Sequence, residues 1–263
     1  MTVLTLAVAQ VEGNQDPERN LETARAQCER AAAMGARVLV FPEMFMALPR
    51  QGEGLEGVAE PLDGPFASAL AEMAAKHGLY LAAGLWEKVP GETRVYNTAC
   101  VFSPAGERVA QYRKLHLFDA LSVRESDRML RGGETPQVID IDGFKVGIAI
   151  CYDLRFPELF RSMSARGVDA ILLPAAWYAG PLKEEQWLTL LKARAIENVC
   201  YAAGSVLCGA PFAGRSAIID PFGVMLCDAG ESSGVVAARI ERKRLDEVRG
   251  KLPALDHRRL DIF

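Results

Sequence analysis

Apolar runs and helical stripes alternate along the first part of the chain. Residues 3–9 and 37–41 form apolar runs typical of buried strands. Between them, apolar residues recur at the spacing of one helix face: Leu21, Ala24, Cys28 and Ala31. Asp16-Pro17 favours a helix start before this stripe, and Gly35 favours its end. The pattern therefore predicts a strand, a helix and a second strand.

The rest of the chain continues this alternation. Further helices are predicted around Leu70, Leu159 and Leu191. Further strands are predicted over residues 80–86, 95–102, 108–112, 144–150, 170–173, 200–207, 216–219 and 224–227. The polar stretch 118–136 is expected to be an irregular active-site loop, and 252–263 a polar C-terminal tail. Helices alternate with strands early and hairpins come later, so we expect one α/β domain over 1–263, with helices covering mixed sheets.

Composition and charge narrow the possible partners. Half of the 263 residues are apolar and 24% are charged, as in an ordinary globular protein with a large core. The net charge of -4 and the lack of a long basic run argue against nucleic acid. No signal peptide or membrane span is visible, so we expect a cytoplasmic protein without a membrane partner. No Gly-rich phosphate-binding motif follows the first strand, so nucleotide binding lacks a basis.

The six cysteines are widely spaced and include no C-x-x-C pair. In a long chain without a secretion signal, this spacing favours reduced thiols over disulfides. No cluster of ligands with zinc-site spacing is present, so we expect no metal.

Cys151 stands out because an apolar, β-branched run ends abruptly at its thiol. A polar turn follows, and then Pro157, which suits the first turn of a helix. A thiol between the carboxyl end of a strand and a helix N-terminus is easily ionised, which suits a nucleophile. The alternative is an inert buried cysteine that acts as a small hydrophobic residue.

Two other predicted strands also end at a reactive residue. Glu43 follows the strand at 37–41, and Lys114 follows the strand at 108–112. Active sites of open α/β sheets gather at the carboxyl ends of strands, so Glu43, Lys114 and Cys151 can meet there. A carboxylate can take the thiol proton, and an ammonium can stabilise an oxyanion, which permits acyl transfer without histidine. Taken singly, Glu43 and Lys114 are typical of exposed surface charges, because charged side chains are mostly exposed.

Three segments together resemble the signatures of the nitrilase superfamily of carbon–nitrogen hydrolases. They are Phe-Pro-Glu at 41–43, Tyr-Arg-Lys-Leu-His-Leu at 112–117, and Cys-Tyr-Asp-Leu-Arg-Phe-Pro-Glu at 151–158. The segment 191–198 and the turn 220–223 extend the resemblance over nearly the whole chain.

The resemblance implies a fold and a mechanism. The fold is a four-layer α-β-β-α sandwich with mixed sheets. In the mechanism Glu43 is the general base, Lys114 stabilises the oxyanion and Cys151 is the nucleophile. Glu125 matches a second glutamate of many members, although an exposed loop glutamate is the alternative. The resemblance also implies a homodimer or a higher homo-oligomer, formed through the helices after the cysteine strand, with residues 252–263 contributing to dimer contacts.

Other segments indicate an amidase branch. Residues 114–120, 173–177, 180–184 and 252–259 resemble the bacterial deaminated glutathione amidases. They resemble less closely the ω-amidases, which act on 2-oxoglutaramate. The implied reaction converts a small carboxylate-bearing amide to an acid and ammonia through a cysteine thioester, and we expect no cofactor because acyl transfer by a thiol requires none. The alternatives are an aliphatic amidase, an N-carbamoyl amino acid hydrolase, a non-catalytic binding protein and a thiol redox sensor.

A carboxylate on the substrate requires a cationic anchor. Arg155 and Lys183 are the candidates, and the alternatives are a structural salt bridge for Arg155 and an exposed surface charge for Lys183. The backbone N–H of Tyr152 is a second candidate oxyanion donor. Trp177 and its neighbour Tyr178 are candidates for the pocket wall, with plain core packing as the alternative.

Overall fold

The computed structural model describes residues 2–259, 261 and 262. Its helices are α1 (Pro17–Ala33), α2 (Pro65–His77), α3 (Pro157–Ala165), α4 (Lys183–Asn198) and α5 (Arg242–Lys251), with short 3-10 helices η1 (Glu125–Asp127) and η2 (Cys151–Arg155). Its strands are β1 (Val3–Glu12), β2 (Val38–Val40), β3 (Tyr80–Glu87), β4 (Val95–Phe102), β5 (Arg108–Arg113), β6 (Asp119–Ala120), β7 (Val123–Arg124), β8 (Met129–Leu130), β9 (Val138–Ile141), β10 (Phe144–Ile148), β11 (Ala170–Ala175), β12 (Tyr201–Cys208), β13 (Ala217–Ile219), β14 (Met225–Asp228) and β15 (Gly234–Glu241).

The long strands form two mixed sheets that join at one corner. The first has the order β5-β4-β3-β2-β1-β15, and the second has the order β9-β10-β11-β12-β13-β14. Strands β1, β2 and β3 are parallel in the first sheet, as are β10, β11 and β12 in the second. The sheets join where the end of β1 pairs with the end of β12.

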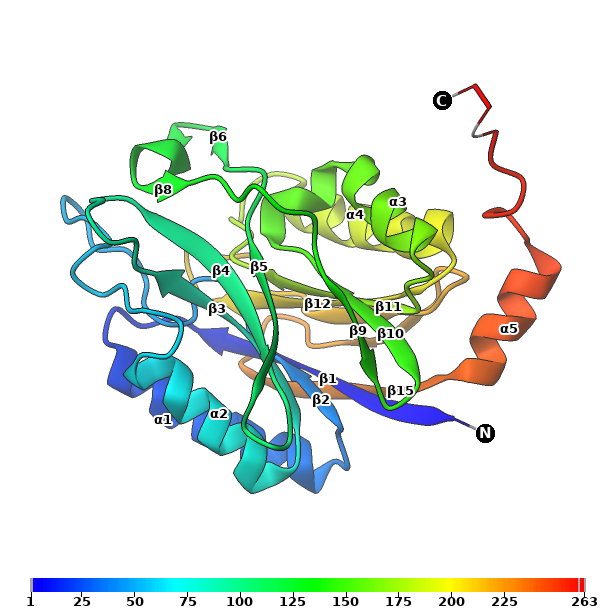
Figure 1. Ribbon diagram of the computed structural model, residues 1–263, viewed down its shortest axis with the longest axis horizontal. Coiled ribbons are helices and arrows are strands. Elements are labelled where there is room, and N and C mark those ends of the chain that lie inside the picture. The colour runs from blue at the N-terminus through cyan, green and yellow to red at the C-terminus, as the bar shows by residue number, and fades with distance from the viewer. Residues whose placement is uncertain (1, 260, 263) are drawn as a thin grey trace.

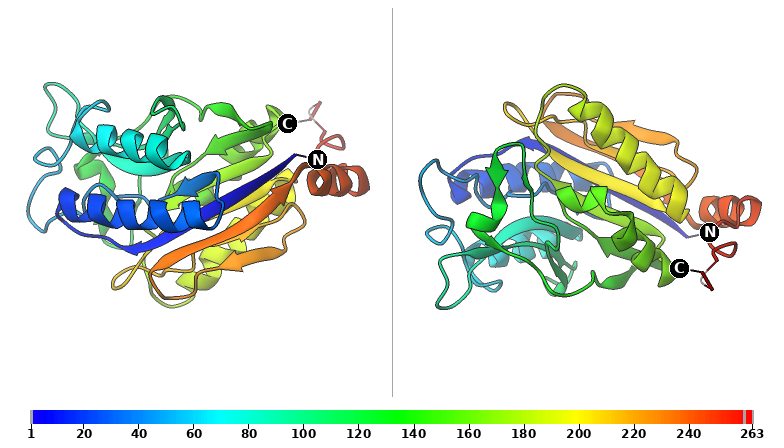
Figure 2. Two further views of the ribbon diagram at one scale, coloured as in Figure 1. Left: turned by 90° about the horizontal axis from the view of Figure 1, so that it is seen from below. Right: turned by 90° about the horizontal axis from the view of Figure 1, so that it is seen from above.

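The sheets pack face to face between two layers of helices. Alternate residues of β1 point to opposite sides: Leu6 and Val8 enter the core between the sheets, and Ala7 and Ala9 pack toward α1 and α2. Helices α3 and α4 cover the outer face of the second sheet (Figures 1 and 2). The predicted four-layer α-β-β-α sandwich with mixed sheets is thereby confirmed.

Local sequence signals place α1 as expected. The Asp16 carboxylate accepts a hydrogen bond from the backbone N–H of Glu18, and Pro17 is the first helical residue. Gly35 follows the helix with a φ of 70°. The predicted strand 3–9 was too short, because β1 continues to Glu12 and uses its last residues to pair with β12.

Two long elements, β15 and α5, had no counterpart in the sequence-based expectations. Strand β15 lies antiparallel along β1, from Val3 opposite Glu241 to Gln10 opposite Gly234. Helix α5 follows directly and is held by buried carboxylates, through Arg242 on Asp169 at 2.7 Å and Arg244 on Asp220 at 2.7 Å. The stretch 118–136 is also more regular than expected, since it contains β6, β7, η1 and β8.

The C-terminal tail leads away from the body of the molecule after α5 (Figure 1). Its part in a dimer stays a prediction. Among the described residues, none of the helices is long and apolar enough to cross a membrane.

Candidate active site

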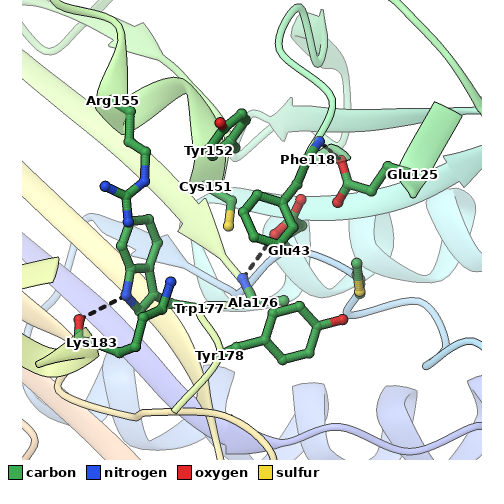
Figure 3. Close-up of a pocket in the computed structure, with 11 residues that line it drawn as sticks. Glu43, Phe118, Glu125, Cys151, Tyr152, Arg155, Ala176, Trp177, Tyr178 and Lys183 are labelled. Carbon is green, nitrogen blue, oxygen red and sulfur yellow. Dashed lines mark hydrogen bonds between the residues drawn. The ribbon is translucent and has the colours of Figure 1, made fainter. Parts of the chain in front are cut away.

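The fold brings the three predicted strand-end residues together. Glu43 lies in the loop after β2, Lys114 directly follows β5, and Cys151 lies just beyond β10 as the first residue of η2. The Lys114 Nζ donates to Glu43 Oε1 at 2.8 Å. The Glu43 carboxylate is close enough to the Cys151 thiol to raise its pKa through charge and a hydrogen bond. Figure 3 shows the Cys151 sulfur near Glu43 at the base of the pocket. All three side chains are buried.

Burial and the neighbouring charges together set the charge state of this group. Burial alone would lower the pKa of Lys114, but Glu125 and Glu43 outweigh it and hold that pKa well above its usual value. Burial and the Glu43 charge raise the pKa of the Cys151 thiol well above its usual value, and Lys114 opposes them only in part. The Cys151 thiol is therefore protonated in the resting site. The expectation that the adjoining helix makes this thiol easy to ionise was wrong, because desolvation dominates.

Cys151 has an unusual backbone conformation. Its φ is 43°, in the left-handed region that residues with side chains rarely adopt. The α-helix expected after the thiol begins at Pro157, as predicted, and the intervening residues form η2. The sharp turn from β10 into η2 places the sulfur at the base of the pocket, where Glu43 also lies (Figure 3).

Glu43 is held by polar groups that sequence reasoning missed. Its Oε1 accepts from the Asn97 Nδ2 at 2.7 Å, and its Oε2 accepts from the backbone N–H of Ala176 at 2.8 Å. The backbone carbonyl of Asn97 also accepts from the N–H of Lys114 at 2.9 Å. Asn97 thus holds Glu43 through its side chain and Lys114 through its backbone. Its sequence signal is a single amide side chain, next to Thr98, in a predicted strand that is mostly apolar.

Glu125 lies in the site and is not an exposed loop residue. It is 6% exposed, and its Oε1 accepts from the Lys114 Nζ at 2.9 Å. Its Oε2 accepts from the backbone N–H of Phe118 at 2.7 Å. Burial raises the pKa of Glu125, Lys114 opposes this, and the charge of Glu43 adds to the rise. Glu125 therefore belongs to the buried charge cluster, and its catalytic role stays a prediction.

A narrow cavity of about 20 Å³ reaches the Cys151 sulfur. It shares lining residues with an outer depression of about 700 Å³. The residues common to both are Phe118, Tyr152, Arg155, Tyr178 and Lys183. The inner space suits a carboxamide head or a single water molecule. The outer space suits the remainder of a larger substrate.

Two cations face this outer space. The Arg155 guanidinium lies 4.9 Å from the ring centre of Trp177, and the Lys183 Nζ lies 4.6 Å from it. Arg155 donates to Gln186 Oε1 at 2.7 Å. Among the described residues, neither cation forms a salt bridge with a carboxylate. Burial, and then the charge of Arg155, lower the pKa of Lys183. The pocket mouth thus carries two positive charges that no acidic side chain in the described chain neutralises.

The other predicted pocket residues also line the site. Tyr152 packs edge-on against Phe118, with ring centres 4.9 Å apart. Trp177 donates from Nε1 to the backbone carbonyl of Lys183 at 2.8 Å, which fixes the start of α4 beside the pocket. All six cysteines are free, and the described residues contain no group of His, Cys, Asp or Glu side chains that could hold a metal.

A sequence model of the carbon–nitrogen hydrolase family matches residues 5–250. The chain belongs to this family of enzymes. It is 37% identical over 244 residues to the deaminated glutathione amidase of Escherichia coli O157:H7, covering 92% of each chain.

Solved structures show the same fold. The C. elegans NitFhit protein superposes with a TM-score of 0.92 at 31% identity, covering 100% of this chain and 66% of that chain. The amidase from Nesterenkonia sp. AN1 superposes with a TM-score of 0.83 at 26% identity, covering 98% of this chain and 95% of that chain. That structure is of a mutant of the amidase, and it shows covalent addition of the acetamide moiety of fluoroacetamide at the active site cysteine.

Proposed function

We propose that this enzyme is an amidase that hydrolyses a carboxylate-bearing amide through a thioester on Cys151, with deaminated glutathione as its type of substrate. The main support is the buried contact between Lys114 and Glu43 beside the Cys151 thiol, at the base of a cavity. The relative from E. coli O157:H7, named for its action on deaminated glutathione, supports the substrate.

In the acylation half of the proposed reaction, the substrate carbonyl enters the inner cavity beside Cys151. Glu43 takes the thiol proton as the sulfur attacks the carbonyl carbon. Lys114 and the backbone N–H of Tyr152 stabilise the oxyanion. Glu43 then passes its proton to the departing nitrogen, the C–N bond breaks, and the acyl group remains on sulfur as a thioester. Because the thiol starts protonated, this mechanism needs the neighbouring carboxylate.

In the second half, water hydrolyses the thioester. After the amine leaves, the inner cavity of about 20 Å³ is large enough for one water molecule. Glu43 removes a proton from this water, which attacks the acyl carbon, and the proton returns to the Cys151 sulfur as the acid departs. Lys114 stabilises the second oxyanion as it does the first.

Arg155 and Lys183 provide the proposed anchor for the substrate carboxylate. They are the two cations at the pocket mouth that lack a carboxylate partner among the described residues. An Arg guanidinium can bind a carboxylate through two parallel hydrogen bonds. The outer depression of about 700 Å³ leaves room for a leaving group larger than ammonia. Both amide bonds of glutathione are secondary, so cleavage of its deaminated form releases an amine, whereas a primary amide releases ammonia. For this substrate, the ammonia expected from the sequence is therefore corrected to an amine.

A substrate screen with two readouts tests this proposal. Deaminated glutathione, 2-oxoglutaramate, neutral aliphatic amides and N-carbamoyl amino acids are assayed for both ammonia and new primary amine. We expect the highest kcat/KM for deaminated glutathione, with an amine as product. Preference for 2-oxoglutaramate with release of ammonia would instead identify an ω-amidase. Carbon dioxide as a product would identify a carbamoyl hydrolase.

The anchor has its own test. Replacement of Arg155 by Gln or of Lys183 by Met removes one cation from the pocket mouth. We expect KM for the carboxylated substrate to rise roughly tenfold, since a hydrogen bond to a charged group contributes about 1.5–3 kcal/mol. Hydrolysis of a neutral aliphatic amide is the control and should be unaffected. Equal losses on both substrates would contradict the anchor.

We also propose a homodimer in the cytoplasm. Exposed apolar side chains on α4 and on the segment from the turn at 220–223 into β14 support an interface on this face: Ile196, Phe222, Val224 and Leu226. The six free cysteines support a reducing compartment.

A further inference from the structure

Asp153 is a fully buried carboxylate that the proposed reaction does not use. One oxygen, Oδ2, accepts from the backbone N–H of Ile150 at 2.9 Å and from the Tyr112 hydroxyl at 2.8 Å. The other, Oδ1, lies 2.7 Å from His116 Nδ1 and accepts from the His116 backbone N–H at 3.2 Å. Four groups therefore converge on one side chain. Since a carboxylate only accepts hydrogen bonds, the Nδ1 of His116 carries a hydrogen.

These partners come from the two segments that carry the reactive groups. Ile150 directly precedes Cys151, whereas Tyr112 and His116 lie on either side of Lys114 along the chain. The Tyr112 hydroxyl also accepts from the N–H of Leu115 at 3.3 Å, so the backbone after Lys114 is held twice. Asp153 thus connects the turn that carries Cys151 to the segment that carries Lys114 through hydrogen bonds.

Asp153 also closes the turn that gives Cys151 its left-handed conformation. Its backbone N–H donates to the Ile150 carbonyl at 2.9 Å, while its side chain accepts from the Ile150 N–H. These two bonds bracket Cys151, whose φ is 43°. A residue in this region persists only when its surroundings fix it.

His116 is held on a second side by an aromatic ring. It stacks on Phe156, with ring centres 3.7 Å apart and planes at 7°. Phe156 follows the last residue of η2. The imidazole therefore contacts the middle of η2, at Asp153, and the residue that follows it, Phe156. Burial and the charge of Asp153 raise the pKa of Tyr112, which keeps its hydroxyl a donor.

We propose that Asp153, together with His116, is a positioning residue that sets the placement of the Cys151 sulfur relative to Glu43 and Lys114. The inference rests on the proposed function, in which Cys151 is the nucleophile. Asp153 touches no reacting atom and acts by fixing the turn.

Replacement of Asp153 by Asn tests the proposal. An Asn side chain keeps the volume, but its NH₂ group would face N–H or O–H donors, so the turn would lose hydrogen bonds. We expect kcat to fall roughly 10- to 100-fold with little change in KM, as misplacement of a reacting group does. The rate at which iodoacetamide alkylates Cys151, followed by peptide mass spectrometry, should fall in parallel. The half-buried Cys227 reports any general opening of the fold in the same sample.

Asp169 offers a matched control. It is also a buried Asp with several hydrogen bonds, but it holds Arg242 and Arg249 of α5. Asp169→Asn should lower the melting temperature while leaving Cys151 alkylation within about twofold of the wild-type rate. If both variants slow alkylation equally, or if Asp153→Asn leaves it within about twofold of wild type, the positioning role is refuted.

A pair of substitutions at His116 keeps the test decisive if Asp153→Asn fails to fold. His116→Phe retains a ring to stack on Phe156 but deletes the bond to Asp153. His116→Asn restores a donor near the position of Nδ1. We expect alkylation of Cys151 to slow several-fold with Phe and to recover with Asn. Equal rates for both variants would refute the role of His116. Alkylation requires no substrate, so these results stand apart from a failure of the wild-type enzyme to hydrolyse any amide.

Discussion

Glu43 affects Cys151 in two ways. It is the proposed acceptor of the thiol proton, and its negative charge raises the pKa of the thiol. Its carboxylate is positioned by Asn97, Lys114 and the backbone of Ala176, and it faces a thiol that burial keeps protonated. A thiol in this state is a weak nucleophile until a base removes its proton. In the proposed mechanism, the Cys151 sulfur therefore becomes a strong nucleophile only when Glu43 takes its proton.

Replacement of Glu43 by Gln separates these two effects. Burial and the Glu43 charge raise the pKa of Cys151, and Lys114 lowers it. Removal of the negative charge while Lys114 remains must lower the thiol pKa, so the thiolate should form at lower pH than in wild type. Hydrolysis should nevertheless fall by roughly 10²-fold or more, because the base is lost. The ultraviolet absorbance of the thiolate against pH, with Cys151→Ala subtracted, measures the pKa. An unchanged or higher pKa would contradict this electrostatic account.

At this scale the sequence predicts the reactive residues but not those that hold them. Glu43, Lys114 and Cys151 could be found because each follows a predicted strand and stands in a segment that resembles a signature of the nitrilase superfamily. Asn97 could not, because its partner Glu43 lies 54 positions away and only the sheet brings them together. The raised pKa of Cys151 was equally hidden, since it depends on burial in the finished fold.

At the level of secondary-structure elements, Gly84 of β3 allows the loop that carries Glu43 to pack closely against this strand. A Cβ on Gly84 would lie 2.9 Å from the Glu43 Cα and 3.1 Å from the Met44 N. The loop after β2 therefore runs against β3 at a distance that no larger residue permits.

Substitution of Gly84 by Ala should displace this loop. We expect a loss of about 1–3 kcal/mol in unfolding free energy from overpacking. We also expect kcat to fall at least roughly tenfold, because Glu43 moves with the loop. Gly57→Ala is the control, since a Cβ there meets nothing within 4 Å. Urea unfolding and steady-state kinetics provide the two readouts. A Gly84→Ala enzyme with wild-type kcat would show that the close approach has no part in catalysis.

Most helices could be predicted because burial of one face gives them a clear period, and the central strands because burial of both faces makes them continuous apolar runs. Strand β15 and α5 could not. Residues of β15 are half-buried along most of its length, so apolar and polar positions alternate weakly. Strand β15 pairs with β1, which lies more than 220 positions earlier in the sequence, so no local pattern indicates the pairing. Helix α5 depends on arginine contacts to Asp169 and Asp220, which no local pattern reveals.

At the level of the whole molecule, the face that carries α4 is the proposed dimer interface. Phe222 is 58% exposed at the turn before β14 and lies near Arg244 rather than in the core. Ile196 of α4 is 44% exposed and lies against the same turn at Gly223. An apolar surface of this kind is typical of an interface.

A charge on this face should therefore weaken association. Phe222→Asp should shift the protein from twice the 28.6 kDa chain mass toward the monomer in sedimentation experiments. Met34 is 48% exposed beside α1, on the opposite outer layer, and Met34→Asp should leave the mass unchanged. A dimer that survives Phe222→Asp but dissociates with Met34→Asp would place the interface on the other layer.

The central claim is that Cys151 forms a covalent bond to the acyl group of an amide. The most direct measurement is the rate of product formation by Cys151→Ala on the best substrate of the screen, with wild type alongside. Loss of a nucleophile typically reduces kcat by on the order of 10⁶-fold, so we expect the variant to fall below about 10⁻³ of the wild-type rate. A Cys151→Ala enzyme that retains a rate within about tenfold of wild type would contradict the mechanism.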